Sequence, residues 1–108
     1  MRKAAIYRNQ EFAGMLTEDE QGHFQFEYDM AYLSDPDKPA VSLTLPKTQR
    51  LHTCEYLFPF FFNMLSEGAN RKLQSRLLKI DEKDHFGILM ATAGADTIGA
   101  ITVKKVSE

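Results

Sequence analysis

The sequence has only one cysteine and no large excess of either charge. Because Cys54 has no second cysteine to pair with, an internal disulfide is excluded, and we expect a reducing, cytoplasmic setting. The 13 basic and 15 acidic residues leave a net charge of −2. A chain built mainly to bind nucleic acid usually has a strongly basic surface, so we expect no direct nucleic-acid binding.

Long apolar runs, linkers and repeats are also missing. The densest apolar segment, residues 56–65, is interrupted by Pro59 and Asn63 and is shorter than the ~20 residues of a membrane helix. The charged N-terminus and the short apolar run that ends at Arg8 do not match a signal peptide. With 44% hydrophobic and 26% charged residues, the chain is typical of a globular protein. We expect one domain over residues 1–108 and no membrane association.

The first half of the chain has the alternation of β-strands. Short apolar runs at residues 4–7 and 12–16 flank a turn signal at residues 9–10, and residues 24–28 alternate apolar with polar side chains. Residues 41–45 also alternate, which predicts a fourth strand that ends before the next proline. These segments predict an antiparallel sheet, with a single helical turn at residues 30–33 and a loop before the fourth strand.

The second half has helical spacing. A helix is predicted from Thr53 as N-cap to about residue 65, in which Pro59 implies either a kink or a start nearer the proline. A second helix is predicted over residues 69–80 and a third from Asp84 as N-cap to a stop at Gly94. In the second helix one face is apolar, comprising Ala69, Leu73, Leu77 and Ile80. With a last strand at residues 98–106, the fold class is α+β.

No arrangement of residues indicates an active site or a metal centre. The three histidines, at positions 23, 52 and 85, lack the close spacing of metal ligands, and Cys54 has no base with an orienting partner. The glycines at 94 and 99 lack the Lys-Ser/Thr of a phosphate-binding loop, and kinase signatures are absent. Carboxylates at residues 18–20 and 81–84 lie in polar turns, which favours solvated side chains. We therefore expect no enzyme, no metal and no cofactor.

Two features suggest contact surfaces. The predicted second helix has basic residues opposite its apolar face, here called the basic ridge: Arg71, Lys72, Arg76 and Lys79. The ridge is either a solvated face or a site for an acidic partner or phosphates.

The second feature is the aromatic segment at residues 58–62, which has four phenylalanines in five positions. Core packing is expected for Phe58 and Phe61. Phe60 and Phe62 are candidates for partner contact, because exposed aromatic side chains tend to mark interfaces.

Four blocks of the sequence resemble, in order and spacing, the N-terminal subdomain of HipA-type serine/threonine kinase toxins. The blocks are Leu-Thr-Leu-Pro at 43–46, Phe-Pro-Phe-Phe-Phe-Asn-Met-Leu-Ser-Glu-Gly at 58–68, Phe-Gly-Ile-Leu at 86–89 and Gly-Ala-Asp-Thr-Ile-Gly-Ala at 94–100. Three positions depart from the family pattern. Phe62 replaces a polar residue, Ser66 replaces a proline, and Ala95 stands where a basic residue is common.

The resemblance implies a small curled antiparallel sheet of four to five strands, packed with about three helices. In HipA proteins a kinase follows this subdomain, whereas here the sequence stops at Glu108. A chain without the kinase resembles HipS, the small antitoxin of split, tripartite HipBST-type bacterial toxin–antitoxin systems. These systems are linked to persistence. We therefore expect a non-catalytic HipS-like subunit that binds and restrains a separate HipA-like kinase.

The alternative is a DNA-associated assembly or repressor-complex factor, which would act through the basic ridge alone or with a helix-turn-helix partner.

For the HipS-like subunit, the expected partners are a HipA-like kinase chain and a HipB-like helix-turn-helix protein in a ternary complex. A homodimer is left open.

Overall fold

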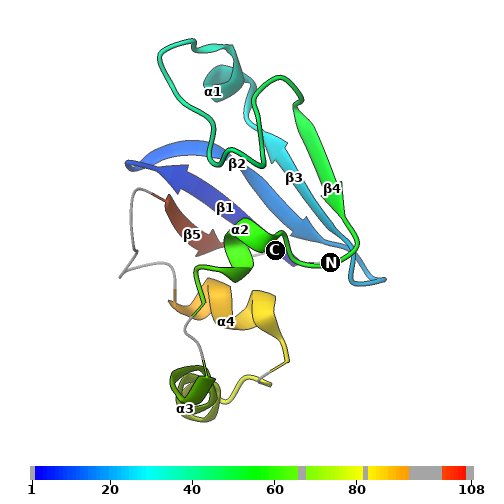
Figure 1. Cartoon of the computed structure of the whole chain (residues 1–108), viewed down its shortest axis with the longest axis vertical. Helices are drawn as coiled ribbons and strands as arrows, with labels where there is room; N and C mark the ends of the chain where they lie inside the picture. The colour runs from blue at the N-terminus through cyan, green and yellow to red at the C-terminus, as the bar shows by residue number, and fades with distance from the viewer. Residues whose placement is uncertain (1, 66–67, 82, 93–100, 107–108) are drawn as a thin grey trace.

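The computed structural model describes residues 2–65, 68–81, 83–92 and 101–106. Within them, five strands form one open antiparallel sheet in the order β4-β3-β2-β1-β5, and four helices accompany it (Figure 1). The strands are β1 (Arg2–Arg8), β2 (Glu11–Glu18), β3 (Phe24–Tyr28), β4 (Leu51–Cys54) and β5 (Ile101–Lys105). The helices are α1 (Met30–Ser34), α2 (Pro59–Phe62), α3 (Gly68–Leu78) and α4 (His85–Thr92). The α+β prediction is confirmed.

The turns between the first three strands follow the predicted local chemistry. Asn9 and Gln10 both have positive φ, 50° and 69°, as a two-residue hairpin loop of type I′ requires. Gly22, with φ of 82°, lies in the turn before β3. In that turn the Asp19 carboxylate accepts hydrogen bonds from the backbone of Gln21 and His23 at 2.8 and 2.9 Å, which lowers the pKa of Asp19. Both turns are thus encoded by residues within them.

The predicted fourth strand is wrong. Residues 41–45 form a tight turn, bridged between Ser42 and Leu45, and Leu43 at its tip is 99% exposed. Val41 and Leu45 are buried instead, and the hydroxyl of Tyr28 accepts from the Val41 backbone at 3.0 Å and donates to the Leu45 carbonyl. The phenol therefore satisfies backbone groups that a neighbouring strand would otherwise have bonded.

The true fourth strand, β4, lies where the sequence suggested the start of a helix. It pairs with β3 so that Phe26 faces His52, and it contains Thr53, the predicted N-cap. The helix begins six residues later at Pro59, in line with the alternative of a start near the proline. Proline suits the first helical position because its missing N–H would have no partner there.

The helix that follows the acidic turn begins as predicted. Asp84 is the N-cap of α4, since its Oδ1 accepts from the backbone N–H of Gly87 at 3.1 Å. Its predicted stop at Gly94, the loop at 94–99 and the departures at Ser66 and Ala95 lie outside the described residues. The last strand is confirmed over Ile101–Lys105.

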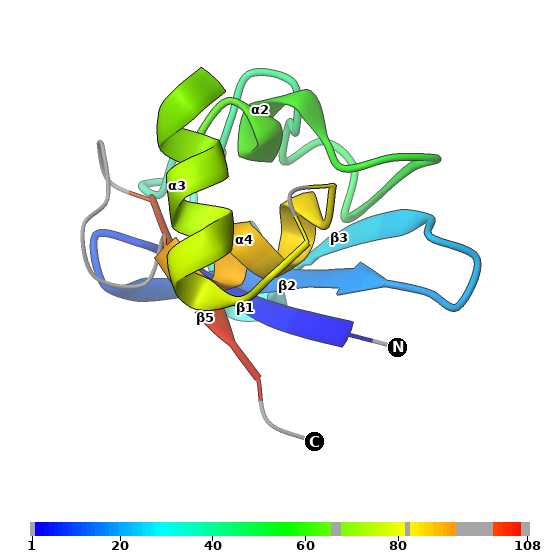
Figure 2. The ribbon, with the colours of Figure 1, turned by 90° about the horizontal axis from the view of Figure 1, so that it is seen from below.

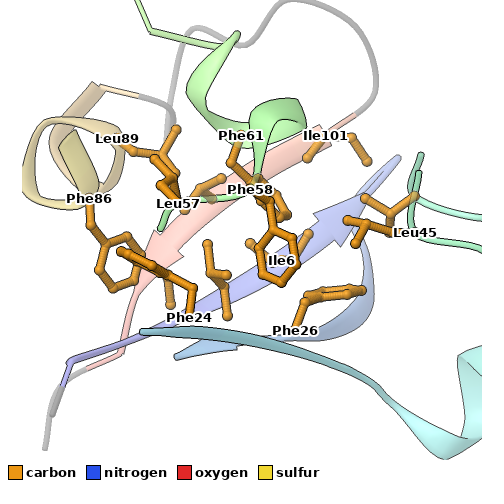
Figure 3. Close-up of a cluster of buried hydrophobic side chains, with 14 of the residues drawn as sticks. Ile6, Phe24, Phe26, Leu45, Leu57, Phe58, Phe61, Phe86, Leu89 and Ile101 are labelled. Carbon is orange, nitrogen blue, oxygen red and sulfur yellow. The ribbon is translucent and has the colours of Figure 1, made fainter. Parts of the chain in front are cut away.

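The core lies between one face of the sheet and the helices α2 and α4 (Figure 3). Rings from the strands meet rings from the helices. Phe26 lies 6.1 Å from Phe61, and Phe24 packs edge-on against Phe86 at 5.4 Å, between ring centroids. Burying side chains of this size stabilises a fold by about 1.5–3 kcal/mol each. The core thus fixes α2 and α4 on the sheet, and α3 lies beyond them (Figures 1 and 2).

Candidate functional site

The four phenylalanines at 58–62 separate into two groups. Phe58 and Phe61 are buried in the core, as predicted. Phe60 is partly buried and packs edge-on against Phe61, with 5.2 Å between ring centroids. Phe62 is 37% exposed, and its ring lies perpendicular to that of His85 at 4.9 Å. Of the two aromatic candidates for partner contact, Phe60 and Phe62, Phe62 is therefore the more exposed.

Ion pairing joins the start of α4 to the sheet, next to His85, the residue that Phe62 contacts. Arg2 in β1 donates to both carboxylate oxygens of Asp84, at 2.9 and 2.8 Å, and to Glu18 of β2 at 2.7 Å. Its guanidinium also lies 5.3 Å from the centre of the Phe86 ring. The hydrogen bond from Arg2 lowers the pKa of Asp84, and the same bond raises the pKa of Arg2.

The expectation of a solvated carboxylate at position 84 is therefore wrong. Asp84 joins the sheet to α4 and caps that helix. Gly87 leaves room for the carboxylate, because a Cβ there would lie 2.4 Å from Asp84 Oδ2. The Arg2–Asp84 pair was not visible in the sequence, since its members lie 82 positions apart.

The basic ridge lies on α3 and at its C-terminus. Lys72, Arg76 and Lys79 are exposed, whereas the side chain of Arg71 lies outside the described part. Lys79 has φ of 58°, and the Ile80 N–H donates to the Ser75 carbonyl at 3.0 Å. These are the features of a Schellman C-terminus, in which Lys79 holds the left-handed position that glycine usually takes.

Two residues of the apolar face predicted for this helix, Leu73 and Leu77, are not buried, and the side chain of Ala69 lies outside the described part. Leu73 and Leu77 are 52% and 72% exposed, and Leu78 is 42% exposed. The reason is the position of α3, which contacts α4 at the end of the molecule farthest from α1 (Figure 1). Among the residues of this face that the structure describes, Ile80, just after the helix, packs against the core. A signal was present, because Leu78 is turned by about 100° from Leu77 and the leucines cannot share one narrow face.

The described residues offer shallow pockets beside Asp84. One of about 270 Å³ is lined by Arg2, Asp84, Gly87 and Met90, among others, and a second of about 180 Å³ lies on the side of Glu55 and His85. Among these residues no group of three His, Cys, Asp or Glu side chains is placed to hold a metal ion. None of the described helices has the length and apolar character needed to cross a bilayer.

Comparisons with known proteins point to one family. A sequence model of the HipA N-terminal domain matches residues 4–104. An uncharacterized protein of Haemophilus influenzae is 30% identical over 105 residues, which are 97% of this chain and 93% of that protein. A protein of Sinorhizobium fredii named "Putative kinase Y4mE" is 27% identical over 101 residues, and the match spans 94% of this chain and only 24% of that protein.

A solved structure has the same fold. It is described as the N-terminal domain of HipA toxin and superposes with a TM-score of 0.75 at 27% sequence identity, covering 100% of this chain and 95% of the other. The resemblance drawn from the four sequence blocks is confirmed.

Proposed function

Because the chain belongs to the HipA N-terminal domain family, we propose that it is a non-catalytic binding subunit that docks on a separate HipA-like serine/threonine kinase and restrains it, as a HipS-like antitoxin does. The observation that carries the proposal is the different share of each relative that the match covers. It makes up 24% of the relative named as a kinase, whereas it spans 93% of the Haemophilus influenzae protein. The domain therefore occurs both joined to a long chain and nearly alone.

The surface near Phe62 supports a binding role. The ring is 37% exposed and lies against His85, whose helix is joined to the sheet through Arg2 and Asp84. An aromatic side chain held in place before binding loses little conformational entropy when a partner covers it. The aromatic side chains phenylalanine, tyrosine and tryptophan dominate the energetics of many interfaces. Phe62 is accordingly our first candidate for the contact with the kinase.

The proposal is tested by co-expression with a HipA-like kinase from the same organism. We expect the two chains to co-purify and the chain to relieve the toxicity of the kinase. Failure of both would end the proposal.

The contact residue is tested by Phe62→Asp, which should weaken kinase binding at least tenfold and leave the thermal midpoint nearly unchanged. Phe12→Asp is a matched control, because Phe12 in β2 has the same 37% exposure and also packs edge-on against one ring, that of Tyr7. A collapse of stability in Phe62→Asp alone would instead assign Phe62 to the core.

A HipB-like helix-turn-helix protein is the further component of the proposed complex. Size-exclusion chromatography of the three chains together, with light scattering, should show one ternary species larger than the kinase-bound pair. A mixture in which the helix-turn-helix protein elutes alone would remove it from the proposal.

A further inference from the structure

The exposed side of α3 has two adjacent columns of side chains. With about 100° per residue, Lys72 and Arg76 lie about 40° apart around the helix axis, and the next arc, at about 100–140°, belongs to Leu73 and Leu77. All four side chains are exposed, the two leucines by 52% and 72%. One continuous face of the helix therefore presents a basic column beside an apolar column, and we call these four residues the two-column face.

The charge of this region is of one sign. Residues 68–80 contain the four basic residues of the ridge and no acidic residue, within a chain whose net charge is −2. In the part of the chain that the structure describes, neither Lys72 nor Arg76 forms an ion pair or a side-chain hydrogen bond. The column is thus available to carboxylates of another molecule.

The exposed leucines of α3 are not part of the buried core. The core is closed by the rings of α2 and α4, and the described residue that follows α3 and reaches this core is Ile80. An exposed apolar patch bordered by polar residues is typical of an interaction surface. The helix has eleven residues and a well-formed Schellman end, so it can serve as a preformed docking element.

We propose that the two-column face docks into an apolar groove with an acidic edge on the partner kinase. The inference rests on the proposed function and adds the chemistry of the partner surface. Leu73 and Leu77 would enter the groove, and Lys72 and Arg76 would meet the carboxylates along its edge. The helices that carry Phe62 and this face, α2 and α3, both contact α4 and lie on the same side of the sheet (Figure 2).

A second copy of the chain fits this face less well. Two copies that met through α3 would bring their basic columns together, and like charges placed side by side oppose association. Charge complementarity therefore favours an acidic partner protein.

The test measures the affinity of three variants for the HipA-like kinase by isothermal titration calorimetry. Leu73→Ser/Leu77→Ser should weaken binding at least tenfold, and Lys72→Gln/Arg76→Gln should weaken it about threefold to tenfold while reducing its dependence on salt. Leu43→Ser is the matched control, since Leu43 is a 99% exposed leucine in the loop before β4, and its affinity should stay within about twofold of wild type. Thermal melts check that each variant is folded.

Each outcome has one meaning. If the wild-type chain does not bind the kinase, the proposed function fails and this inference fails with it. If the wild type binds and the leucine pair binds equally well, the two-column face is overturned while the proposed function stands.

Two further results would identify a different occupant and so overturn the proposal. One is a wild-type dimer that the leucine variant converts to a monomer. The other is binding of duplex DNA that depends on the basic pair alone. If the Leu73→Ser/Leu77→Ser variant does not fold, the Lys72→Gln/Arg76→Gln variant provides the test. Unchanged kinase affinity and unchanged salt dependence in that variant would also overturn the proposal.

Discussion

The sheet and α3 use their apolar residues in opposite ways. In β1 the consecutive residues Ala4, Ala5 and Ile6 are all buried, so both faces of that strand are covered. In α3 the leucines at 73, 77 and 78 are all more than two-fifths exposed. The difference shows that the buried core lies between the sheet and the helices α2 and α4, whereas α3 leaves apolar side chains exposed.

The largest expected difference between the two regions is in the response to truncation. Phe26→Ala in β3 should lower the free energy of unfolding by about 3–5 kcal/mol, because the fully buried ring contacts Tyr28 and Phe61. Leu77→Ala in α3 should change it by less than about 0.5 kcal/mol. Urea denaturation with a common m-value measures both. Equal losses would show that α3 is part of the core.

The second prediction concerns the close approach of β2 and β3. A Cβ at Gly14 would lie 2.4 Å from the Glu27 carbonyl oxygen and 3.0 Å from the Phe26 ring, so Gly14→Ala forces the strands apart and should cost about 1–3 kcal/mol. Gly22→Ala is the control, since it has no neighbour within 4 Å and only its φ of 82° is unfavourable. A loss below about 0.5 kcal/mol in Gly14→Ala would contradict the close approach.

The third prediction concerns the connection between the sheet and α4, the helix that α3 contacts. Arg2 holds the pKa of Asp84 below its ordinary value of 3.8, so the carboxylate stabilises the folded state above pH 4 and this contribution is lost as the pH falls through the lowered pKa. Asp84→Asn should cost about 1 kcal/mol at pH 7, because the pair is partly exposed. It should also flatten the acid side of the stability profile. Parallel wild-type and mutant profiles below pH 4 would refute the coupling.

The smallest effect should be a gain. Lys79→Gly relieves the left-handed backbone at the end of α3, which costs a residue with a Cβ about 1 kcal/mol. We expect the thermal midpoint to rise by a few degrees, whereas Lys72→Gly within the helix should lower it, since glycine disfavours helix by up to about 1 kcal/mol. A decrease in Lys79→Gly would show that its side chain stabilises the fold.

Local signals were enough for the turns and for most of the sheet. Asn9-Gln10 and Gly22 encode their turns within two or three residues, and Asp84 caps α4 as its position suggested. Each of these features depends on neighbours along the chain.

Features that depend on distant contacts were not predictable. The strict alternation at residues 41–45 arises from a turn folded over Tyr28, so Val41 and Leu45 are buried without being in a strand. The exposure of Leu73 and Leu77 depends on where α3 docks. The pairing of Arg2 with Asp84 depends on the completed sheet, because β1 must already lie beside the helix layer.

The order of strands in the sheet has a consequence for synthesis of the protein. β1, near the N-terminus, has β2 on one side and β5 on the other, so Ile6 pairs with Val103. Until residues 101–105 leave the ribosome, one edge of β1 has no strand partner, and an unpaired edge is open to intermolecular pairing. The pairing of β1 with β5 joins segments that are far apart in the sequence, and such long-range contacts slow folding. The nascent chain is therefore most vulnerable to aggregation in the interval before β5 emerges.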